Sequence, residues 1–350
     1  MSKRQKLSFI HFEDLPNEIL LEIFFLLDFK GVVQCGQVSQ RLRAISNDET
    51  FWSKLNLFGR KVPFSFIERA IQNGCEYLNL GLSCVCGGKK SKVPWKLKYL
   101  EISQSSDKLA QEMPKGVLEN CRYLQKLALN NFILNSYDIE QICQNGQTLQ
   151  ILSLEGCNID YHHRPEVIQK LFSKCPQLTE LNMNRGVGAS TNPGHKGLLK
   201  EHVCALVDNL TPNILKLQLG AQPWVRDKHV NTLAQRCNKL TEIVLSATTI
   251  SNGSGESIAN LNSLEKLDVE YTFFYPPIQS ISKLKILRFG SGFHDDAEEI
   301  KNLKLQFPHI SINEEYLHIA HPYKSVNGYH DQNWLWEIRA EQQTLFSKAQ

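Results

Sequence analysis

Residues Phe12–Leu27, which read FEDLPNEILLEIFFLL, combine a helix-start pattern with an unusually wide apolar surface. Pro16 suits a first helical turn, where its missing N–H costs nothing, and Asp14 and Glu18 complement the positive end of the helix dipole. At 100° per residue, one half of the helix carries Leu15, Ile19, Leu20, Ile23, Phe24, Leu26 and Leu27. This stripe spans about 180°, more than the roughly 100° expected of a helix that faces one core.

A second, narrower apolar stripe lies inside the polar half of the same predicted helix. It consists of Leu21 and Phe25, four residues apart. One core cannot easily bury both stripes, so two interpretations stay open. The helix is either sandwiched inside its own domain or completed by a partner protein.

Further along the chain, the pattern apolar-x-x-apolar-x-apolar recurs. Eight strong copies begin at Leu97, Leu124, Leu149, Leu178, Ile214, Leu240, Leu264 and Leu284, and weaker ones begin at Trp52, Cys75 and Phe307. The strong copies recur about every 27 residues, within the period of leucine-rich repeats. The pattern predicts an α/β fold, a leucine-rich-repeat solenoid of about ten repeats.

Each copy is expected to form a short strand, followed by a turn and a helix such as 167–175 that returns the chain. Stacking would place the strands on a concave face and the helices on a convex face. The predicted concave lining is polar and mixed in sign, and includes Lys126, Asn130, Glu155, Glu180, Asn182, Lys216, Gln218, Glu242, Lys266, Asp268, Glu270 and Arg288. Such a lining suits a protein partner better than a small apolar ligand.

Overall composition narrows the class of protein. The formal net charge of the 350 residues is +3, too small and too scattered to indicate nucleic-acid binding. No apolar run of about 18 residues and no signal-peptide core occurs, so we expect no membrane segment and a location in the nucleus and cytoplasm. The basic residues Lys3, Arg4 and Lys6 are either a weak nuclear signal or a solvated terminus.

The ten cysteines are expected to stay reduced in that compartment rather than form disulfides. Cys121, Cys175 and Cys237 each lie three residues before a repeat begins, which indicates packing as small buried hydrophobes. Cys84 and Cys86 are separated by one residue, too close for a zinc half-site. The sequence therefore predicts no metal and no cofactor.

Sequence motifs of catalysis are missing. The glycine-rich segment 185–199 lacks the spacing of a phosphate loop, and we interpret it as an insertion at the rim of the array, either disordered or a binding loop. The adjacent His162 and His163 are expected in a loop between repeats. No nucleophile elbow, zinc-protease motif or carboxylate pair occurs, so an enzyme is not predicted.

One family combines these features. Leu15-Pro16-x-Glu18-Ile19-Leu20-x-x-Ile23-Phe24, followed by Val38-Ser39-x-Arg41 and Phe51-Trp52, resembles the F-box, the module by which receptors of SCF ubiquitin ligases dock on the Skp adaptor. Leu42 departs from the family, which usually has tryptophan there. The resemblance implies adaptor contact through Leu15, Pro16, Ile19, Leu20, Ile23 and Phe24, and the second stripe adds Leu21 and Phe25 as partner-facing candidates.

Over its whole length the chain resembles the F-box/leucine-rich-repeat receptors of the S-phase kinase-associated type. The tail carries Ile319–Pro322 and Leu335–Ile338, which resemble the segment that folds back over the concave face in that family. The resulting predicted organisation is an N-terminal tail (1–11), a helical F-box (12–58) joined directly to leucine-rich repeats (59–313), and a C-terminal tail (314–350).

The resemblance implies a non-catalytic substrate receptor of a RING-type E3 ubiquitin ligase, linked to cullin and RING subunits through the adaptor. The family's receptor takes a phosphorylated cell-cycle substrate and uses a small Cks accessory protein, whose site cannot be assigned to residues here. A phosphate needs arginine or lysine. The candidate substrate-binding residues are Arg185, Lys216, Lys266, Asp268, Glu270, Arg288 and Trp336.

A second interpretation is a leucine-rich-repeat binding or scaffold protein without a ubiquitin role. In that case the N-terminal helices would only cap the array, since terminal repeats need a polar outer face. Adaptor binding discriminates between the two. The sequence leaves open the substrate, the need for phosphorylation or a Cks protein, the role of 185–199, and whether the tail moves on binding.

Overall fold

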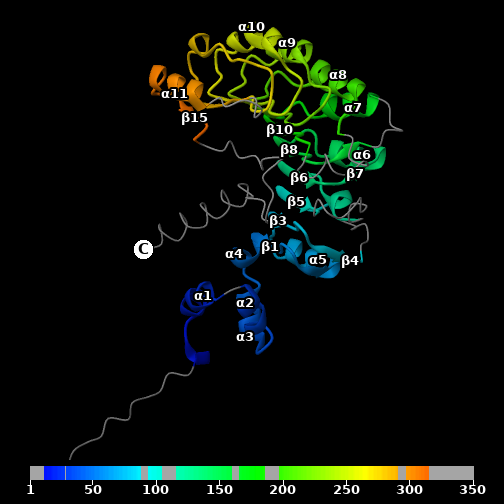
Figure 1. Cartoon of the computed structure of the whole chain (residues 1–350). Helices are drawn as coiled ribbons and strands as arrows, with labels where there is room; N and C mark the ends of the chain where they lie inside the picture. The colour runs from blue at the N-terminus through cyan, green and yellow to red at the C-terminus, as the bar shows by residue number, and fades with distance from the viewer. Residues whose placement is uncertain are drawn as a thin grey trace, which may run out of the picture.

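The structure is a computed structural model that describes residues 12–27, 29–87, 94–104, 116–159, 165–185, 197–290 and 297–314. A group of short helices leads into a curved array of strands and helices (Figure 1). The predicted N-terminal and C-terminal tails, apart from Glu314, lie outside the described residues, as do His162 and His163.

The N-terminal group begins with the 3-10 turn η1 (Phe12–Asp14) and contains the helices α1 (Asn17–Phe25), α2 (Phe29–Cys35), α3 (Gln40–Ser46) and α4 (Glu49–Trp52). These helices share a small core of Leu20, Phe24, Val32, Leu42 and Ile45. Leu42 is buried there, so the leucine that departs from the F-box pattern still fills a core position. A core of this size stabilises a module only marginally without further contacts.

The array is built on one parallel sheet of 11 strands among the described residues. In sheet order they are β1 (Lys54–Asn56), β3 (Tyr77–Asn79), β5 (Tyr99–Ser103), β6 (Lys126–Asn130), β8 (Ile151–Ser153), β10 (Glu180–Asn182), β11 (Lys216–Gln218), β12 (Glu242–Val244), β13 (Lys266–Asp268), β14 (Ile286–Arg288) and β15 (Ser311–Ile312). Each strand falls on one strong or weak copy of the repeat pattern. The predicted leucine-rich-repeat fold is confirmed.

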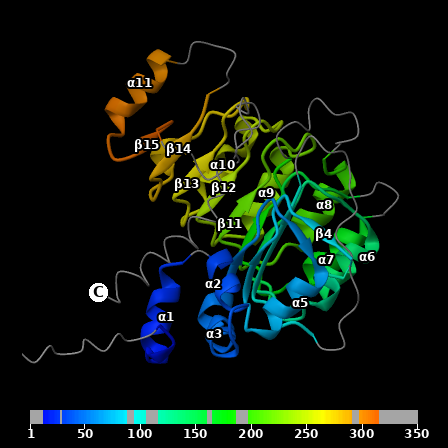
Figure 2. The ribbon, with the colours of Figure 1, turned by 90° about the horizontal axis from the view of Figure 1, so that it is seen from below.

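The helices and 3-10 turns that return the chain from one strand to the next lie on the side of the array opposite the main sheet (Figures 1 and 2). They are α5 (Phe64–Gln72), η2 (Leu118–Asn120), α6 (Ser136–Cys143), α7 (Glu166–Lys174), α8 (Lys200–Asn209), α9 (Asp227–Arg236), η3 (Asn252–Ser254), α10 (Gly255–Ala259), η4 (Ile278–Ser280) and α11 (Ala297–Gln306). Two small parallel sheets, β2 (Lys61–Pro63) with β4 (Cys84–Cys86) and β7 (Ile133–Leu134) with β9 (Asn158–Ile159), lie beside the main sheet's turns.

A left-handed residue recurs just after the strands. Ala221, Ala247 and Tyr271 have φ angles of 59°, 54° and 58°. Their N–H groups donate to carbonyl oxygens of the next repeat at 2.7, 2.8 and 2.6 Å. The turn satisfies a backbone donor and directs the chain toward the convex side, which offsets the cost of φ > 0 for a non-glycine residue.

Trp52 joins the helical group to the array. Its side chain is fully buried in the array's main core, and its indole Nε1 donates to the Ser46 carbonyl oxygen at 2.7 Å. The ring lies edge-on to Phe29 at 5.1 Å and beside Phe66 of α5 at 5.9 Å. Strand β1 begins two residues later, which confirms that the helical module runs directly into the first repeat.

The cysteines take the packing positions predicted for them. Cys121, Cys175 and Cys237 are buried, and burial raises the pKa of their thiols to about 12, 12 and 11. Cys84 is exposed and Cys86 half-buried in β4. Across the described ranges, no group of three or more His, Cys, Asp and Glu side chains could hold a metal ion. None of the described helices is long and apolar enough to cross a membrane.

Candidate functional site

Helix α1 and the residues beside it divide their apolar side chains between the small core and the surface. Leu20 and Phe24 have no exposed area. The side chains left open to solvent are Phe12, Ile19, Phe25, Leu26 and Leu27, with exposed fractions of 46%, 39%, 44%, 86% and 39%. We call these five residues the α1 apolar surface. They occur within one short segment, which is the arrangement expected of an interaction site.

The second stripe lies partly against the module itself. Leu21 is half-buried and packs on the small core, while the Phe25 ring lies 4.8 Å from the Phe51 ring and remains partly exposed. The module therefore buries some of each stripe and leaves the rest open, and completion of the helix by a partner protein stays a prediction. The stripe pattern alone does not show this division.

The other predicted adaptor-contact residues lie around α1 as well. Pro16 is exposed, whereas Leu15 and Ile23 are half-buried. Arg41 of α3 anchors the start of the helix, since it donates to the Leu15 carbonyl oxygen at 2.5 Å and to the Asn17 side-chain oxygen at 2.8 Å. The exposed members can contact a partner directly, and the buried Leu20 and Phe24 can act only by shaping the helix. The adaptor role of all eight stays a prediction.

The concave face presents ion pairs between neighbouring strands. At one register position, Glu180, Lys216, Glu242 and Lys266 follow one another across β10 to β13. Lys216 Nζ lies 2.9 Å from a Glu180 oxygen, and Lys266 Nζ lies 3.6 Å from a Glu242 oxygen. Both predicted substrate-binding lysines therefore have carboxylate partners on the adjacent strand. Both lysine side chains stay partly exposed, so an incoming anion can reach them, although Glu242 is itself buried.

Amide side chains fill the neighbouring positions of the concave face. Asn182 Nδ2 donates to Glu155 at 3.1 Å, and Gln218 Nε2 donates to Glu242 at 3.3 Å. Asn184 accepts the Gly220 N–H at 2.6 Å. This polar, mixed lining matches the one predicted from the sequence, and it suits hydrogen bonding to a protein partner.

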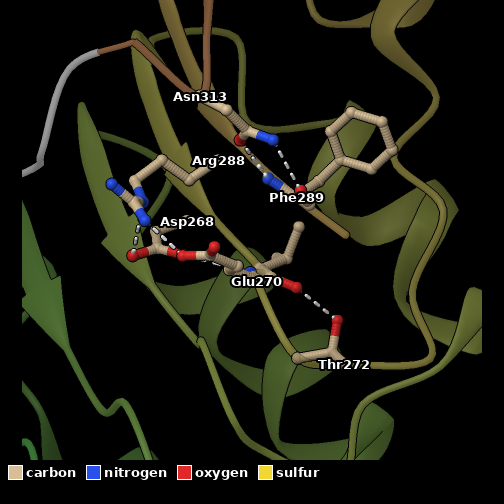
Figure 3. A network of polar contacts seen from close by, with 7 residues as sticks. Asp268, Glu270, Thr272, Arg288, Phe289 and Asn313 are labelled. Carbon is tan, nitrogen blue, oxygen red and sulfur yellow. Dashed lines mark hydrogen bonds and ion pairs between the residues drawn. The ribbon is translucent and has the colours of Figure 1, made fainter. Parts of the chain in front are cut away.

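Arg288, Asp268 and Glu270 form a buried charge network at the C-terminal end of the array (Figure 3). The Arg288 guanidinium, 6% exposed, pairs with Glu270 and lies 3.8 Å from an Asp268 oxygen. The Glu270 backbone N–H also donates to Asp268 at 3.1 Å. Because two carboxylates already engage the guanidinium, a substrate phosphate would have to compete with both. The network is thus better suited to holding β13 and β14 together than to receiving a phosphate.

The remaining substrate-face candidates separate into two groups. Arg185 is half-buried, and its backbone N–H donates to the Gly220 carbonyl oxygen at 2.9 Å. Residues 186–196 of the predicted insertion and Trp336 lie outside the described residues. The structure places the Arg185 side chain beside Gly197.

Sequence reasoning missed Glu101, a buried carboxyl group on the concave face of β5. Glu101 is 3% exposed and accepts a hydrogen bond from the Tyr99 hydroxyl at 3.0 Å. Burial raises its pKa to about 7, although the Tyr99 hydrogen bond acts in the opposite direction. The only available signal was an acidic residue at a cavity-facing position of the first strong repeat.

Glu101→Gln is expected to change the pH dependence of stability. The folded pKa lies above that of the unfolded chain, so the folded state binds more protons and its stability falls as the pH rises from about 4.5 to 7. The amide cannot ionise, so the variant should be more stable than the natural chain by about 1–3 kcal/mol at pH 8 and nearly equal at about pH 4. Urea midpoints at the two pH values measure this. An equal stability difference between variant and natural chain at both pH values would contradict this prediction. So would a Glu101→Gln variant whose stability varies with pH in the same way as that of a control variant, Glu298→Gln, at an exposed position.

The fold and the exposed α1 segment define a class of protein, a helical F-box module followed by a leucine-rich-repeat array. A family model described as F-box-like matches residues 12–57. The model described as the SKP2 LRR domain matches residues 65–343, well over half of the chain. The chain belongs to this SKP2-type leucine-rich-repeat family.

Individual proteins are similar to parts of the chain. The F-box protein dre-1 of Caenorhabditis elegans is 38% identical over 55 residues, which are 15% of this chain and 6% of that protein. The chain thus spans a small fraction of that relative's length. A chain of the yeast Rad7–Elc1 complex has a similar fold, with a TM-score of 0.50 and 13% identity over 78% of this chain and 72% of that one. The TLR13–ssRNA13 complex matches with a TM-score of 0.43 and 18% identity, covering 65% of this chain and 34% of that one.

Proposed function

We propose that this chain is the substrate-recognition subunit of an SCF-type E3 ubiquitin ligase. The observation that carries the proposal is the order of the two family matches, with F-box-like residues 12–57 directly before SKP2-type repeats at 65–343. The α1 apolar surface supports it, since a soluble module that exposes five large apolar side chains in one segment needs a partner to cover them. A Skp-class adaptor would be that partner.

In this role the chain performs no bond chemistry. It binds the adaptor through the helical module and a substrate through the array, and the adaptor links it to cullin and RING subunits. The gain is an increased effective concentration of substrate near the ubiquitin-charged enzyme. The similar yeast fold was solved in a complex of Rad7 with Elc1, which is consistent with a chain of this type that works with a bound partner.

The concave face would receive the substrate. We propose a phosphorylated protein of the cell-cycle type, met in the nucleus and cytoplasm, with a Cks protein as an accessory. Lys216 and Lys266 are the better phosphate candidates, because their side chains are 41% and 34% exposed, whereas that of Arg288 is 7% exposed. Arg288 is held more firmly by Asp268 and Glu270. Substrate binding should therefore depend on the two lysines more than on the arginine.

Co-purification tests the proposal. The full-length chain is expressed with a Skp adaptor and cullin, beside a version that lacks 12–27. We expect the intact chain to retain both partners and the shortened chain to lose both, while its array keeps a cooperative thermal transition. Failure of the intact, folded chain to retain the adaptor would overturn the proposal and favour a leucine-rich-repeat scaffold.

A further inference from the structure

A hollow lies where the helical module meets the first repeat. Its volume is about 360 Å³, and it is lined by Val33, Gly36, Gln37, Arg43, Asn47 and Arg69. The first five belong to α2, α3 and the residues just after these helices, whereas Arg69 belongs to α5 of the array. The hollow therefore spans the junction and presents one arginine from each side of it.

Both arginines are fixed at the hollow by contacts with neutral groups. Arg43 Nε donates to the Gly36 carbonyl oxygen at 3.1 Å. Arg69 Nη2 donates to the Asn47 side-chain oxygen at 3.0 Å, and its guanidinium carbon lies 5.3 Å from the centre of the Trp52 ring. A guanidinium has five N–H donors. Most donors of both side chains are left for another acceptor.

The two arginines at the hollow carry positive charge that is not engaged in ion pairs with described acidic residues. In the described part of the chain, neither Arg43 nor Arg69 forms an ion pair. One oxygen of Asp48, which follows Asn47 in the sequence, accepts from the backbone N–H and the hydroxyl of Thr50 at the start of α4. Two guanidinium groups that face one hollow, without an ion-pair partner in the described ranges, create a local charge suited to a dianion.

We propose that this hollow binds a phosphate monoester between Arg43 and Arg69. A phosphate carries nearly two negative charges at neutral pH and accepts bidentate hydrogen bonds from guanidinium groups. A single carboxylate would match only half of the charge. Since one arginine comes from the helical module and the other from the array, the bound phosphate ties the two together and stiffens the junction around Trp52.

The phosphate has two chemical sources, a phosphorylated side chain of a protein or a small organic phosphate. Calorimetry and thermal unfolding of the full-length chain test both, with N-acetylphosphoserine amide and glycerol 1-phosphate as probes at constant ionic strength. N-acetylserine amide and chloride are the reference compounds. Saturable binding of a phosphate probe, with a rise in the unfolding temperature, supports the proposal. A probe preferred at least tenfold over the other identifies the source, and equal binding assigns the site to the phosphate group itself.

Arg43→Lys and Arg69→Lys separate a fork-shaped site from a general positive field. Each keeps the charge but loses bidentate geometry, so phosphate binding should weaken at least tenfold. Arg60→Lys, at an exposed position outside the hollow, is the matched control and should bind as the natural chain does. If the unliganded Arg69→Lys chain does not unfold cooperatively, Arg43→Lys decides alone. Unsaturable binding, an equal effect of chloride, or unchanged affinity in Arg43→Lys would overturn the proposal.

Discussion

Replacing Trp52 by alanine is expected to lower the free energy of unfolding by about 3–5 kcal/mol. The ring is fully buried and packs on Phe29 from the helical module and Phe66 from the array. Its removal leaves a cavity at the junction and frees the buried Ser46 carbonyl oxygen, which now accepts from Nε1. The helical module depends on this contact with the array's main core, because its own core of five buried side chains is small. The helical module should therefore unfold at lower denaturant than the array.

Trp224→Ala is the matched control for this prediction, because Trp224 is 38% exposed on a loop of the array and contacts the Arg226 side chain. It should cost less than about 1 kcal/mol. Urea unfolding followed by circular dichroism compares the two variants with the natural chain. Similar midpoints for Trp52→Ala and Trp224→Ala would show that the junction is not held by the buried indole.

The repeat array was predictable because its signal is periodic and local. Each strand needs only inward apolar residues at a fixed spacing, and 11 copies reinforce one another, so even the weak copies at Trp52, Cys75 and Phe307 mark real strands. The direct join followed from the same pattern, since the copy at Trp52 overlaps the last residues of the F-box motif.

The side-chain partners could not be predicted in the same way. The burial of Leu20 and Phe24 depends on how α1 packs against α3, and the contact of Phe25 with Phe51 depends on α4. The pairing of Arg288 with Glu270 depends on the register of β13 and β14. A single sequence fixes which residues face the cavity but not which charges neutralise one another.

The arginine pair at the junction illustrates the same limit. Arg43 and Arg69 are 26 residues apart and belong to different parts of the chain, so no motif relates them. Only the contact of Asn47, just after α3, with Arg69 of α5 brings both to one hollow. Sites assembled across a junction carry no local sequence signal.

Changing Ile19 and Leu26 together to aspartate is expected to weaken adaptor binding at least 100-fold. Both side chains belong to the α1 apolar surface, with 39% and 86% exposed, so charges there should leave the helical module folded. In a desolvated interface each substitution would remove apolar burial and leave an unpaired carboxylate out of contact with water. The expected cost in binding free energy is about 2 kcal/mol or more per site. Since 1.4 kcal/mol corresponds to a tenfold change in affinity, the two substitutions together should lower the affinity for the adaptor more than 100-fold.

Surface plasmon resonance with immobilised adaptor measures this change, and Leu305→Asp provides the control. Leu305 is 73% exposed on α11, at the opposite end of the array, so its replacement should leave adaptor affinity unchanged. Leu21→Asp with Phe25→Asp tests the second stripe separately. Because Leu21 packs on the small core, loss of binding there must be accompanied by an unchanged thermal midpoint before it is assigned to the interface. Normal adaptor binding by the Ile19→Asp, Leu26→Asp chain would exclude the α1 apolar surface as the adaptor site. Loss of adaptor binding in this chain, but not in the Leu305→Asp control, would show that α1 docks on the adaptor and does not only cap the array.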